Sequence, residues 1–330
     1  MNRVLITGAC GFIGSCLCRR LLAEGHEVVG IDNMSRKGVE FNARELTPLP
    51  GFHLVRGDLV DFAATESLFQ SRGPFSAVFH LAGQVAVTSS YQDRLGDFQN
   101  NARSGFNVVE NVRRHSPDAY CLYSSTNKVY VHLVVNEPVG LDATLQPYTP
   151  YGVSKAVADL YFLEYGRQEL GLQTCILRQS CIYGHHQYGV EDLGWLAWFA
   201  IANILGRPVT IYGDGHQVRD LLFVDDLVDL YLECWSKKLT GAFPVGGGAG
   251  NAICIDSALK LICEKTGKQF KSITHGPTRP GDQPYFVADL RWATSKTLSW
   301  KPRVQLHEGM SKMITWIYEN RELIEQVISK

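Results

Sequence analysis

The N-terminal part of the chain alternates between short apolar runs and polar or glycine-rich breaks. Residues 4–6 form an apolar run of strand length, and the apolar spacing over 13–24 is typical of an amphipathic helix. A second apolar run, 28–31, ends at Asp32. This order predicts a strand, a turn, a helix and a second strand, with an acidic residue where that second strand ends.

The same alternation continues further along the chain. Runs at 52–55, 77–81 and 119–123 are rich in residues that favour strands, and segments with helical spacing separate them. The residues that directly follow these runs are small or polar: Gly57 and Asp58, Ala82 and Gly83, and Ser124 and Ser125. Strands that alternate with helices predict an α/β fold, a doubly wound parallel sheet of the Rossmann type. Such sheets bind ligands beyond the carboxyl ends of their strands.

The alternation weakens after about residue 180, and glycine, histidine, tryptophan and proline become more frequent. Segment 223–235 returns to the earlier pattern. We therefore assign 1–180, with about 223–248 returning, to a first domain, and 181–222 and 249–330 to a smaller α+β lobe. A chain of 330 residues is long for one simple core, which agrees with two unequal lobes.

The first break is a glycine motif, TGACGFIG at 7–14. Gly8, Gly11 and Gly14 allow a tight turn, a close approach of the backbone to a diphosphate, and close packing of the helix on the strand. The N-terminus of the helix then faces the diphosphate. Asp32 can accept hydrogen bonds from the adenosine ribose hydroxyls and would repel a 2′-phosphate. The first domain is therefore predicted to bind NAD, in preference to NADP.

Three charged residues near this motif have alternative interpretations. Arg36 and Lys37 follow Asp32 closely, so NADP remains an alternative cofactor, although we interpret the two residues as part of a solvated turn. Asp58 is interpreted either as a ligand of the adenine edge or as the cap of a helix that begins near Val60.

Tyr151 and Lys155 are one helical turn apart and therefore share one face of a helix. A free tyrosine has a pKa of about 10. A cation about 4 Å away, at an effective dielectric constant of about 20, contributes ~4 kcal/mol, or about three pKa units. We expect Lys155 and the positive nicotinamide ring to lower the pKa of Tyr151, which then acts as a base on a hydroxyl group. Ser124, Ser125 and Thr126 end another strand and can bond the same hydroxyl.

These residues resemble the extended short-chain dehydrogenases/reductases, the family of NAD-dependent epimerases and dehydratases of nucleotide sugars. The resemblance covers essentially the whole chain. Its motifs are TGACGFIG, the aspartate at 32, HLAG at 80–83, Asn101, SSTNKVY at 124–130, YGVSK at 151–155, IYG at 182–184 and RPGDQ at 279–283. Within the family, HLAGQVAVTSS at 80–90, GWLAWF at 194–199 and FVAD at 286–289 are most similar to the CDP-tyvelose (CDP-paratose) 2-epimerase subgroup.

The resemblance implies a role for each matching residue. The catalytic group would be Tyr151 as the base, Lys155 as its partner, and Thr126 and Ser125 as hydroxyl donors. NAD would be bound by Gly8, Gly11, Phe12, Ile13, Gly14, Asp32, Asn33, Asp58, Leu59, Leu81, Ala82, Gly83, Asn101, Ser124, Tyr151 and Lys155. The nucleotide-diphosphate sugar would be bound by Gln84, Thr126, Asn127, Cys181, Arg219, Arg279 and Asp282. Guanidinium groups pair bidentately with phosphate oxygens, so the two arginines would hold the diphosphate.

Dehydratases of this family carry an acid pair after the threonine, where this chain has Asn127 and Lys128. An amide and an ammonium cannot replace an aspartic acid and a glutamate in acid–base chemistry, which disfavours dehydration. The expected reaction is epimerisation: Tyr151 removes a proton from a sugar hydroxyl, hydride passes to NAD⁺, the ketone turns over, and hydride returns to its opposite face. The subgroup likeness implies C2 of a CDP-deoxyhexose, whereas likeness to UDP-sugar 4-epimerases would imply C4.

Two departures from the family pattern leave the identity of the sugar unassigned. Val131 and His132 stand where the family usually has a glycine, which predicts a different loop over the sugar. Cys181 stands where many relatives have an asparagine that touches the diphosphate. A net nucleotide-sugar reductase or dehydrogenase is a second enzyme hypothesis, and a non-catalytic NAD-binding regulator is a third of another class.

The composition limits the classes of partner that we expect for this protein. Charged residues make up 20% of the chain and the formal net charge is -1, which gives no reason to expect nucleic acid or a membrane surface. The apolar run 193–205 is too short to span a bilayer, and the N-terminus does not resemble a signal peptide, so we expect a cytoplasmic protein. Nine scattered cysteines without CxxC spacing suggest neither zinc nor disulfides. Family likeness implies a homodimer or homotetramer, built through helices near 99–115 and 152–170.

Overall fold

The structure is a computed structural model that describes residues 1–130, 137–296 and 298–329. Val131 and His132 lie outside the described residues. Seven strands form the main sheet, in the order β10-β6-β5-β4-β1-β2-β3, and every pairing is parallel. Their bounds are β1 (Arg3–Thr7), β2 (Glu27–Asp32), β3 (Phe52–Arg56), β4 (Ala77–His80), β5 (Tyr120–Thr126), β6 (Gln173–Gln179) and β10 (Gly241–Val245).

The strand order reverses direction beside β1. From β1 the chain moves outward to β2 and β3, then crosses back so that β4 pairs with β1 on its other side. Thr7 and His80, the last residues of β1 and β4, are partners in the register. The carboxyl ends of these two strands therefore meet at a topological switch point, which is where open parallel sheets bind ligands.

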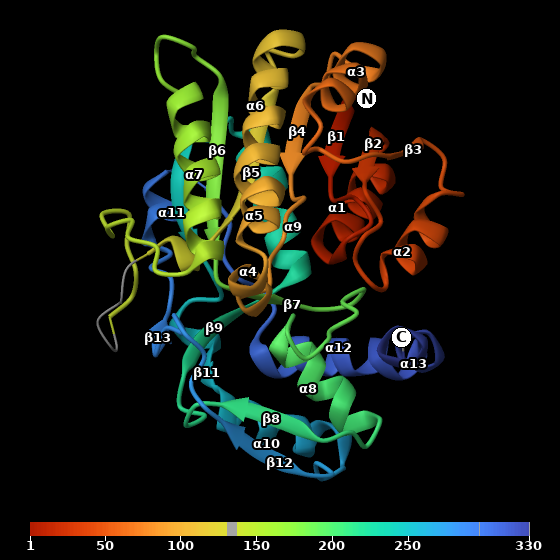
Figure 1. The fold of residues 1–330 in the computed structure, drawn as a ribbon, viewed down its shortest axis with the longest axis vertical. Coiled ribbons are helices and arrows are strands. Elements are labelled where there is room, and N and C mark those ends of the chain that lie inside the picture. Colours follow the sequence, from red (N-terminus) through yellow and green to blue (C-terminus); the bar gives the residue numbers. More distant parts are fainter. Residues whose placement is uncertain (131–136, 297, 330) are drawn as a thin grey trace.

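Helices cover both faces of the main sheet (Figure 1). On β1, Val4 and Ile6 belong to one hydrophobic cluster and Leu5 to another, because successive side chains on a strand point to opposite faces. The first cluster includes side chains of α1 and α9, and the second includes those of α3, α6 and α7. The bounds of these helices are α1 (Phe12–Ala23), α3 (Phe62–Arg72), α6 (Ser104–His115), α7 (Pro150–Tyr165) and α9 (Val224–Ser236).

Shorter helical segments connect these elements. Before α3 comes α2 (Val39–Leu46), and α4 (Val87–Gln92), α5 (Arg94–Phe98) and a π-helical turn (Gln99–Arg103) lead into α6. A 3₁₀ turn, Asn127–Val129, follows β5 directly.

A smaller α+β region lies at the carboxyl-end side of the main sheet (Figure 1). Its strands are β7 (Cys181–Tyr183), β9 (Val218–Phe223), β11 (Ala252–Cys254) and β13 (Tyr285–Phe286) in one sheet, and β8 (Val209–Tyr212) with β12 (Ile273–Gly276) in another. Its helical segments are α8 (Trp195–Ile204), the 3₁₀ turn Ala249–Asn251, α10 (Ile255–Thr266), α12 (Leu306–Glu319) and α13 (Arg321–Ser329). The short helix α11 (Arg291–Ser295) lies beside the main sheet (Figure 1), where Trp292 Nε1 donates to the carbonyl oxygen of Pro244 in β10 at 2.8 Å. The expected fold class is confirmed. Its division into a cofactor domain and a substrate lobe stays a prediction.

Two findings bear on the expectations from composition. Within the described ranges, no helix is long and apolar enough to cross a membrane. All nine cysteines are free, and most of them are buried.

Helix α7 is held against the sheet by buried polar contacts. It begins after Thr149, whose hydroxyl accepts a hydrogen bond from the backbone N–H of Gly152 at 2.9 Å. Further along, the fully buried carboxylate of Asp159 accepts two hydrogen bonds from Arg178 of β6, at 2.9 and 2.8 Å. The hydroxyl of Ser125, on β5, donates to the same carboxylate at 2.9 Å. The helix that carries Tyr151 and Lys155 is thereby fixed to two neighbouring strands.

Replacing Arg178 by methionine should destabilise the protein strongly. The change leaves the buried Asp159 carboxylate without its counter-ion, which typically costs about 3–5 kcal/mol. Arg321→Met is the matched control, because it removes a pair with Glu325 whose two side chains are 52% and 45% exposed, and such pairs contribute less than about 1 kcal/mol. Urea denaturation measures both free energies of unfolding. Equal losses in the two variants would contradict the anchoring role of Arg178.

Candidate active site

A cavity of about 670 Å³ lies beyond the carboxyl ends of the main-sheet strands and is bordered on its other side by β7 and the start of α8. All predicted NAD-binding residues except Asn101 line it. The other predicted site residues in its lining are Gln84, Ser125, Thr126 and Cys181. Asn127, Arg219, Arg279 and Asp282 are not among its lining residues.

The glycine turn between β1 and α1 forms one wall of the cavity. Gly8 has a φ of +67°, and a Cβ atom there would lie 2.9 Å from the backbone nitrogen of Ala82. A Cβ atom on Gly14 would overlap the carbonyl oxygen of Gly8. Glycine is therefore required at both positions, and it brings the N-terminus of α1 to the cavity. A helix N-terminus carries a partial positive charge and binds phosphate groups.

Asp32 lies at the end of β2 and borders the cavity. Its carboxylate accepts hydrogen bonds from the backbone N–H groups of Cys10 at 3.0 Å and Met34 at 2.9 Å, which leave lone pairs for a ribose hydroxyl. Arg36, which the sequence placed in a solvated turn, also lines the cavity. Its Nη2 donates to the carbonyl oxygen of Gly83 at 3.1 Å, which links the segment after β2 to the loop after β4.

Asp58 borders the cavity and also stabilises its own loop. Its Oδ1 accepts a hydrogen bond from the backbone N–H of Val60 at 3.0 Å, and its Oδ2 accepts one from Asn33 Nδ2 at 3.3 Å. The alternative interpretation as a helix cap is wrong, because Asp61 caps α3 by accepting from the backbone N–H of Ala64.

Thr7 fixes the loop that follows β4. Its hydroxyl oxygen accepts hydrogen bonds from the backbone N–H groups of Leu81 and Ala82, both at 3.0 Å, and lies 2.7 Å from His80 Nδ1. Leu81, Ala82 and Gly83 are thereby presented to the cavity. Thr7 carries no ligand-like signal in the sequence beyond its place before the first glycine.

Tyr151 is 6% exposed at the first turn of α7. Burial raises the pKa of its hydroxyl to about 12, although a hydrogen bond with Thr126 lowers it. Without cofactor, burial thus outweighs any effect of Lys155 on the phenol, and the expectation that Lys155 and the nicotinamide ring together lower this pKa stays a prediction. Burial also lowers the pKa of Lys155 to about 7, while Asp159 and Asp97 raise it. Desolvation disfavours both charged forms, so neither group helps the other to ionise.

Lys155 is nevertheless held in place. Its Nζ donates to the carbonyl oxygen of Ser124 at 2.6 Å and lies 4.3 Å from the ring centroid of Tyr123. The hydroxyl of Ser124 accepts from Gln179 Nε2 at 2.9 Å. The hydroxyl of Ser125 donates to Asp159, so its expected catalytic role is not supported by its orientation. Of the three hydroxyls at the end of β5, the one that meets Tyr151 is that of Thr126.

Asn101 lies behind the wall of the cavity and not on its surface. It is 1% exposed, and its Nδ2 donates to the hydroxyl of Ser154 at 3.0 Å and to Asp97 at 3.3 Å. A Cβ atom on Gly83 would come within 2.6 Å of Asn101 Oδ1. Asn101 is thus separated from the cavity by Gly83, in place of the direct cofactor contact that the motif predicts.

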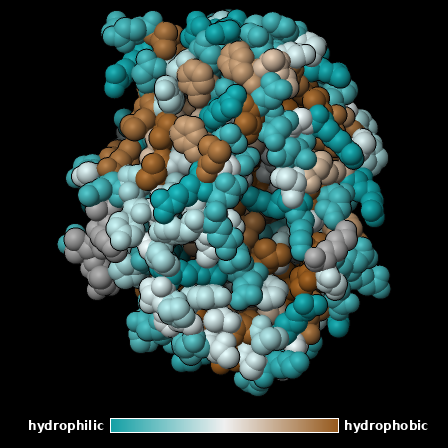
Figure 2. Space-filling model, in the orientation of Figure 1, coloured by the Kyte–Doolittle hydropathy of each residue, from teal (hydrophilic) through white to brown (hydrophobic). Residues whose placement is uncertain are grey.

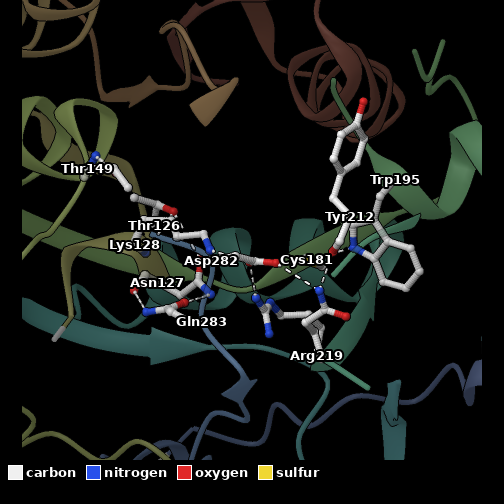
Figure 3. A network of polar contacts seen from close by, with 12 residues as sticks. Thr126, Asn127, Lys128, Thr149, Cys181, Trp195, Tyr212, Arg219, Asp282 and Gln283 are labelled. Atoms are coloured by element: carbon white, nitrogen blue, oxygen red, sulfur yellow. Dashed lines mark hydrogen bonds and ion pairs between the residues drawn. The ribbon is translucent and has the colours of Figure 1, made fainter. Parts of the chain in front are cut away.

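The structure gathers several predicted substrate residues beside Thr126 (Figure 3). Asn127 Nδ2 donates to Gln283 Oε1 at 3.0 Å, and Gln283 Nε2 donates back to the carbonyl oxygen of Asn127 at 3.2 Å. This reciprocal pair joins the turn after β5 to the RPGDQ loop. The amide of Asn127, which is 5% exposed, is therefore occupied by Gln283 and does not face the cavity.

The two predicted diphosphate arginines occupy different places. Arg219 Nη2, on β9, donates to Asp282 Oδ1 at 2.8 Å. Arg279 stacks on the ring of Tyr212, 4.1 Å from its centroid, and pairs with Asp192 at 3.3 Å. Asp192 lines the cavity, so Arg279 stands at its edge.

A second wall of the cavity was not predicted from the sequence. The segment between β7 and α8 contributes this wall, and Trp195 Nε1 donates to the thiol of Cys181 at 3.4 Å. A Cβ atom on Gly189 would lie 2.8 Å from the backbone nitrogen of Trp198, so this segment packs tightly against α8. The glycines at 189 and 194 are the sequence signal that indicates such a close approach.

Comparison with known proteins agrees with this geometry. The model of the NAD dependent epimerase/dehydratase family matches residues 4–244. The chain belongs to this family. A family enzyme described as CDP-paratose 2-epimerase, from Salmonella typhi, is 37% identical over 95% of this chain and 98% of its own length. A UDP-glucose 4-epimerase from Mycolicibacterium smegmatis is 30% identical over 94% of this chain and 97% of its own.

A solved structure of the family has the same fold. The UDP-glucose 4-epimerase of Thermus thermophilus, in complex with NAD, superposes with a TM-score of 0.86 at 31% identity, covering 96% of this chain and 99% of that one. NAD is the cofactor of the family, and the glycine turn fits it, because Gly8, Gly11 and Gly14 all line the cavity at the N-terminus of α1, where no side chain stands between the backbone and a diphosphate. In residues 1–130, 137–296 and 298–329 no group of three or more metal-ligating side chains is placed to hold an ion.

Replacing Gly14 by alanine should abolish most NAD binding. The new methyl group overlaps the Gly8 carbonyl oxygen, so α1 must move away from β1 and the helix N-terminus leaves the diphosphate position. We expect at least about a tenfold loss of NAD after purification, since each 1.4 kcal/mol is tenfold. Gly250→Ala is the control, because a Cβ atom there meets open space. The measurement is the amount of NAD that each purified variant releases when it is denatured. An unchanged NAD content in the Gly14 variant would contradict this account.

Proposed function

We propose that this family member is an NAD-dependent epimerase of a nucleotide-diphosphate sugar that acts at C2 of a CDP-deoxyhexose. The observation that carries the proposal is that Tyr151, Lys155 and Thr126 line one cavity together with the glycine turn, with Thr126 close enough to Tyr151 to lower the pKa of its phenol. A phenol and an alcohol that meet at one point can bind and deprotonate a single sugar hydroxyl.

The residues divide the work of such a reaction. Tyr151 removes the proton from the sugar hydroxyl and later returns it, while Thr126 holds the same hydroxyl oxygen. Lys155 Nζ donates to the Ser124 carbonyl oxygen and so holds the start of α7 against the end of β5. The glycine turn and Asp32 would hold NAD⁺, which would supply the hydride acceptor and a positive charge. Since burial raises the pKa of Tyr151 to about 12, a positive charge close to this phenol would favour its deprotonation.

The turn after Thr126 supports epimerisation over dehydration. Asn127 and Lys128 hold the positions of the acid pair of the family's dehydratases, and the amide of Asn127 is tied to Gln283. Neither side chain can act as a carboxylic acid at the sugar. The CDP-paratose 2-epimerase relative supports C2 of a CDP-sugar. The UDP-glucose 4-epimerase relative supports the second candidate, C4 of a UDP-sugar.

We also propose that the enzyme assembles as a homodimer through the helices near 99–115 and 152–170. Large apolar side chains are exposed on this side, with exposed fractions of 67% for Leu95, 49% for Phe98, 47% for Val153, 55% for Leu160 and 42% for Tyr161. Figure 2 shows brown side chains gathered over the region where Figure 1 places α5, α6 and α7. Exposed apolar patches of this kind mark protein interaction sites.

The direct test is turnover without added cofactor. CDP-, UDP-, GDP- and dTDP-sugars are incubated with the purified enzyme in deuterated water, and the products are analysed by NMR and mass spectrometry. We expect the CDP-sugar to be inverted at C2 with no solvent deuterium on carbon, because hydride is returned from the bound cofactor. Deuterium at the inverted carbon would indicate a deprotonation mechanism, and a requirement for added NADH would indicate a reductase.

In the same assay, Tyr151→Phe should lower kcat by about 10²–10⁴-fold, the usual contribution of a positioned acid–base group. Tyr318→Phe is the control, since Tyr318 is 41% exposed on α12 and neither lines the cavity nor lies on the helices of the proposed dimer. Both variants should retain NAD. Full activity in the Tyr151 variant would contradict the mechanism.

A further inference from the structure

Two cations share one carboxylate oxygen beside the active site. Arg219 Nη2 lies 2.8 Å from Asp282 Oδ1, and Lys128 Nζ lies 3.3 Å from the same atom. Figure 3 shows Asp282 between the two basic side chains, with Cys181 next to them. They come from three separate parts of the chain: Lys128 from the turn after β5, Arg219 from β9 and Asp282 from the loop before β13.

This cluster is partly buried and carries an excess positive charge. The exposed fractions of the side chains are 16% for Lys128, 8% for Arg219 and 22% for Asp282. Burial raises the pKa of the neighbouring Cys181 thiol, which therefore stays neutral. Asp220, the next residue after Arg219, is turned to the backbone N–H groups of Gly248 and Ala288. Lys128, Arg219 and Asp282 together carry one excess positive charge, which a bound anion would balance.

The cluster adjoins the catalytic hydroxyls. The backbone N–H of Lys128 donates to Thr126 Oγ1 at 3.3 Å, which ties the turn that carries Lys128 to the residue that meets Tyr151. Thr126 and Cys181 both line the cavity, and the charges of Lys128 and Arg219 both act on Cys181. The excess positive charge therefore lies next to the part of the cavity wall that Thr126 and Cys181 form.

We propose that the ammonium group of Lys128 binds a phosphate of the substrate's diphosphate together with Arg219, a role that rests on the proposed function. Asp282 holds the two cations in position before the substrate arrives, and a phosphate oxygen then takes over part of its contacts. Ammonium and guanidinium groups are the usual phosphate ligands in proteins. Lys128 thus anchors the anionic part of the substrate close to Thr126, in addition to its effect of excluding dehydration.

The charge state of Lys128 makes this binding depend on pH. Burial and the charge of Arg219 lower the pKa of Lys128 to about 8, whereas Asp282 raises it, and Cys181 is the other titratable group that faces it. The ammonium form binds phosphate and the neutral amine does not. Affinity for a nucleoside diphosphate should therefore fall as the pH rises through about 8. An arginine at position 128 stays charged and should remove this dependence.

The test is the equilibrium binding of CDP to the NAD-bound enzyme by calorimetry. Lys128→Met should weaken CDP binding by about tenfold to a hundredfold, because hydrogen bonds to charged groups contribute in that range. Lys128→Arg should bind within a few-fold of the wild type at pH 7 and should not weaken at pH 9, where the wild type does. Lys312→Met, which removes an exposed lysine paired with Glu308, is the control and should not change binding. Unchanged CDP affinity in Lys128→Met would overturn the proposal.

Two further outcomes separate this proposal from the proposed function. If the wild type binds none of CDP, UDP, GDP and dTDP, the proposed function fails and the role of Lys128 with it. If a diphosphate binds the wild type and Lys128→Met equally well, the proposed function stands and the role of Lys128 fails. If Lys128→Met does not fold, Asp282→Asn provides the test. The melting temperature of Asp282→Asn should be lower than that of the wild type, and CDP should raise the melting temperature of this variant by more than it raises that of the wild type. An equal or smaller rise would overturn the proposal.

Discussion

The attachment of helix α7 to the ends of β5 and β6 is the constraint on which the site depends. Lys155 Nζ donates a hydrogen bond to the Ser124 carbonyl oxygen. One turn further along, the Asp159 carboxylate accepts hydrogen bonds from Ser125 and Arg178. These contacts are buried, so breaking any of them leaves an unsatisfied polar group, which is costly in a low-dielectric interior. These contacts hold the start of α7 close to the end of β5, which places Tyr151 beside Thr126.

The same burial has an electrostatic consequence. Desolvation raises the pKa of the phenol to about 12 and lowers that of the amine to about 7, and both shifts disfavour a phenolate–ammonium pair. The protein alone thus holds the base in its protonated state. In the proposed mechanism a further positive charge close to the phenol would favour its deprotonation, and the NAD cofactor of the family carries such a charge. The proposal therefore couples the acid–base step to the presence of the cofactor.

The sequence predicted those features that depend on local pattern. Short apolar runs, helical spacing and the glycines at 8 and 14 depend on neighbours in the chain, and they indicated β1, α1 and the turn between them correctly. The family motifs then identified Tyr151 and Thr126, which the structure brings together.

The sequence could not supply partners that are distant in the chain. Ser125 and Asn127 belong to a conspicuous motif, yet their side chains are occupied by Asp159 and Gln283. Asn101 is screened from the cavity by Gly83 in a similar way. The burial of Tyr151 could not be predicted for the same physical reason: a sequence shows that a cation is near, but the desolvation that raises the pKa of this phenol to about 12 is set by the folded surroundings.

The most direct measurement of this account is the pKa of Tyr151 itself. Carbon-13 NMR of protein labelled at tyrosine Cζ, with Tyr151→Phe to assign the signal, reports that pKa with and without bound NAD⁺. The account predicts a value well above 10 without the cofactor and a value lower by about three units with it, the size expected of one nearby positive charge. The same pKa in both forms would contradict the claim that a buried phenol becomes the base only beside the cofactor.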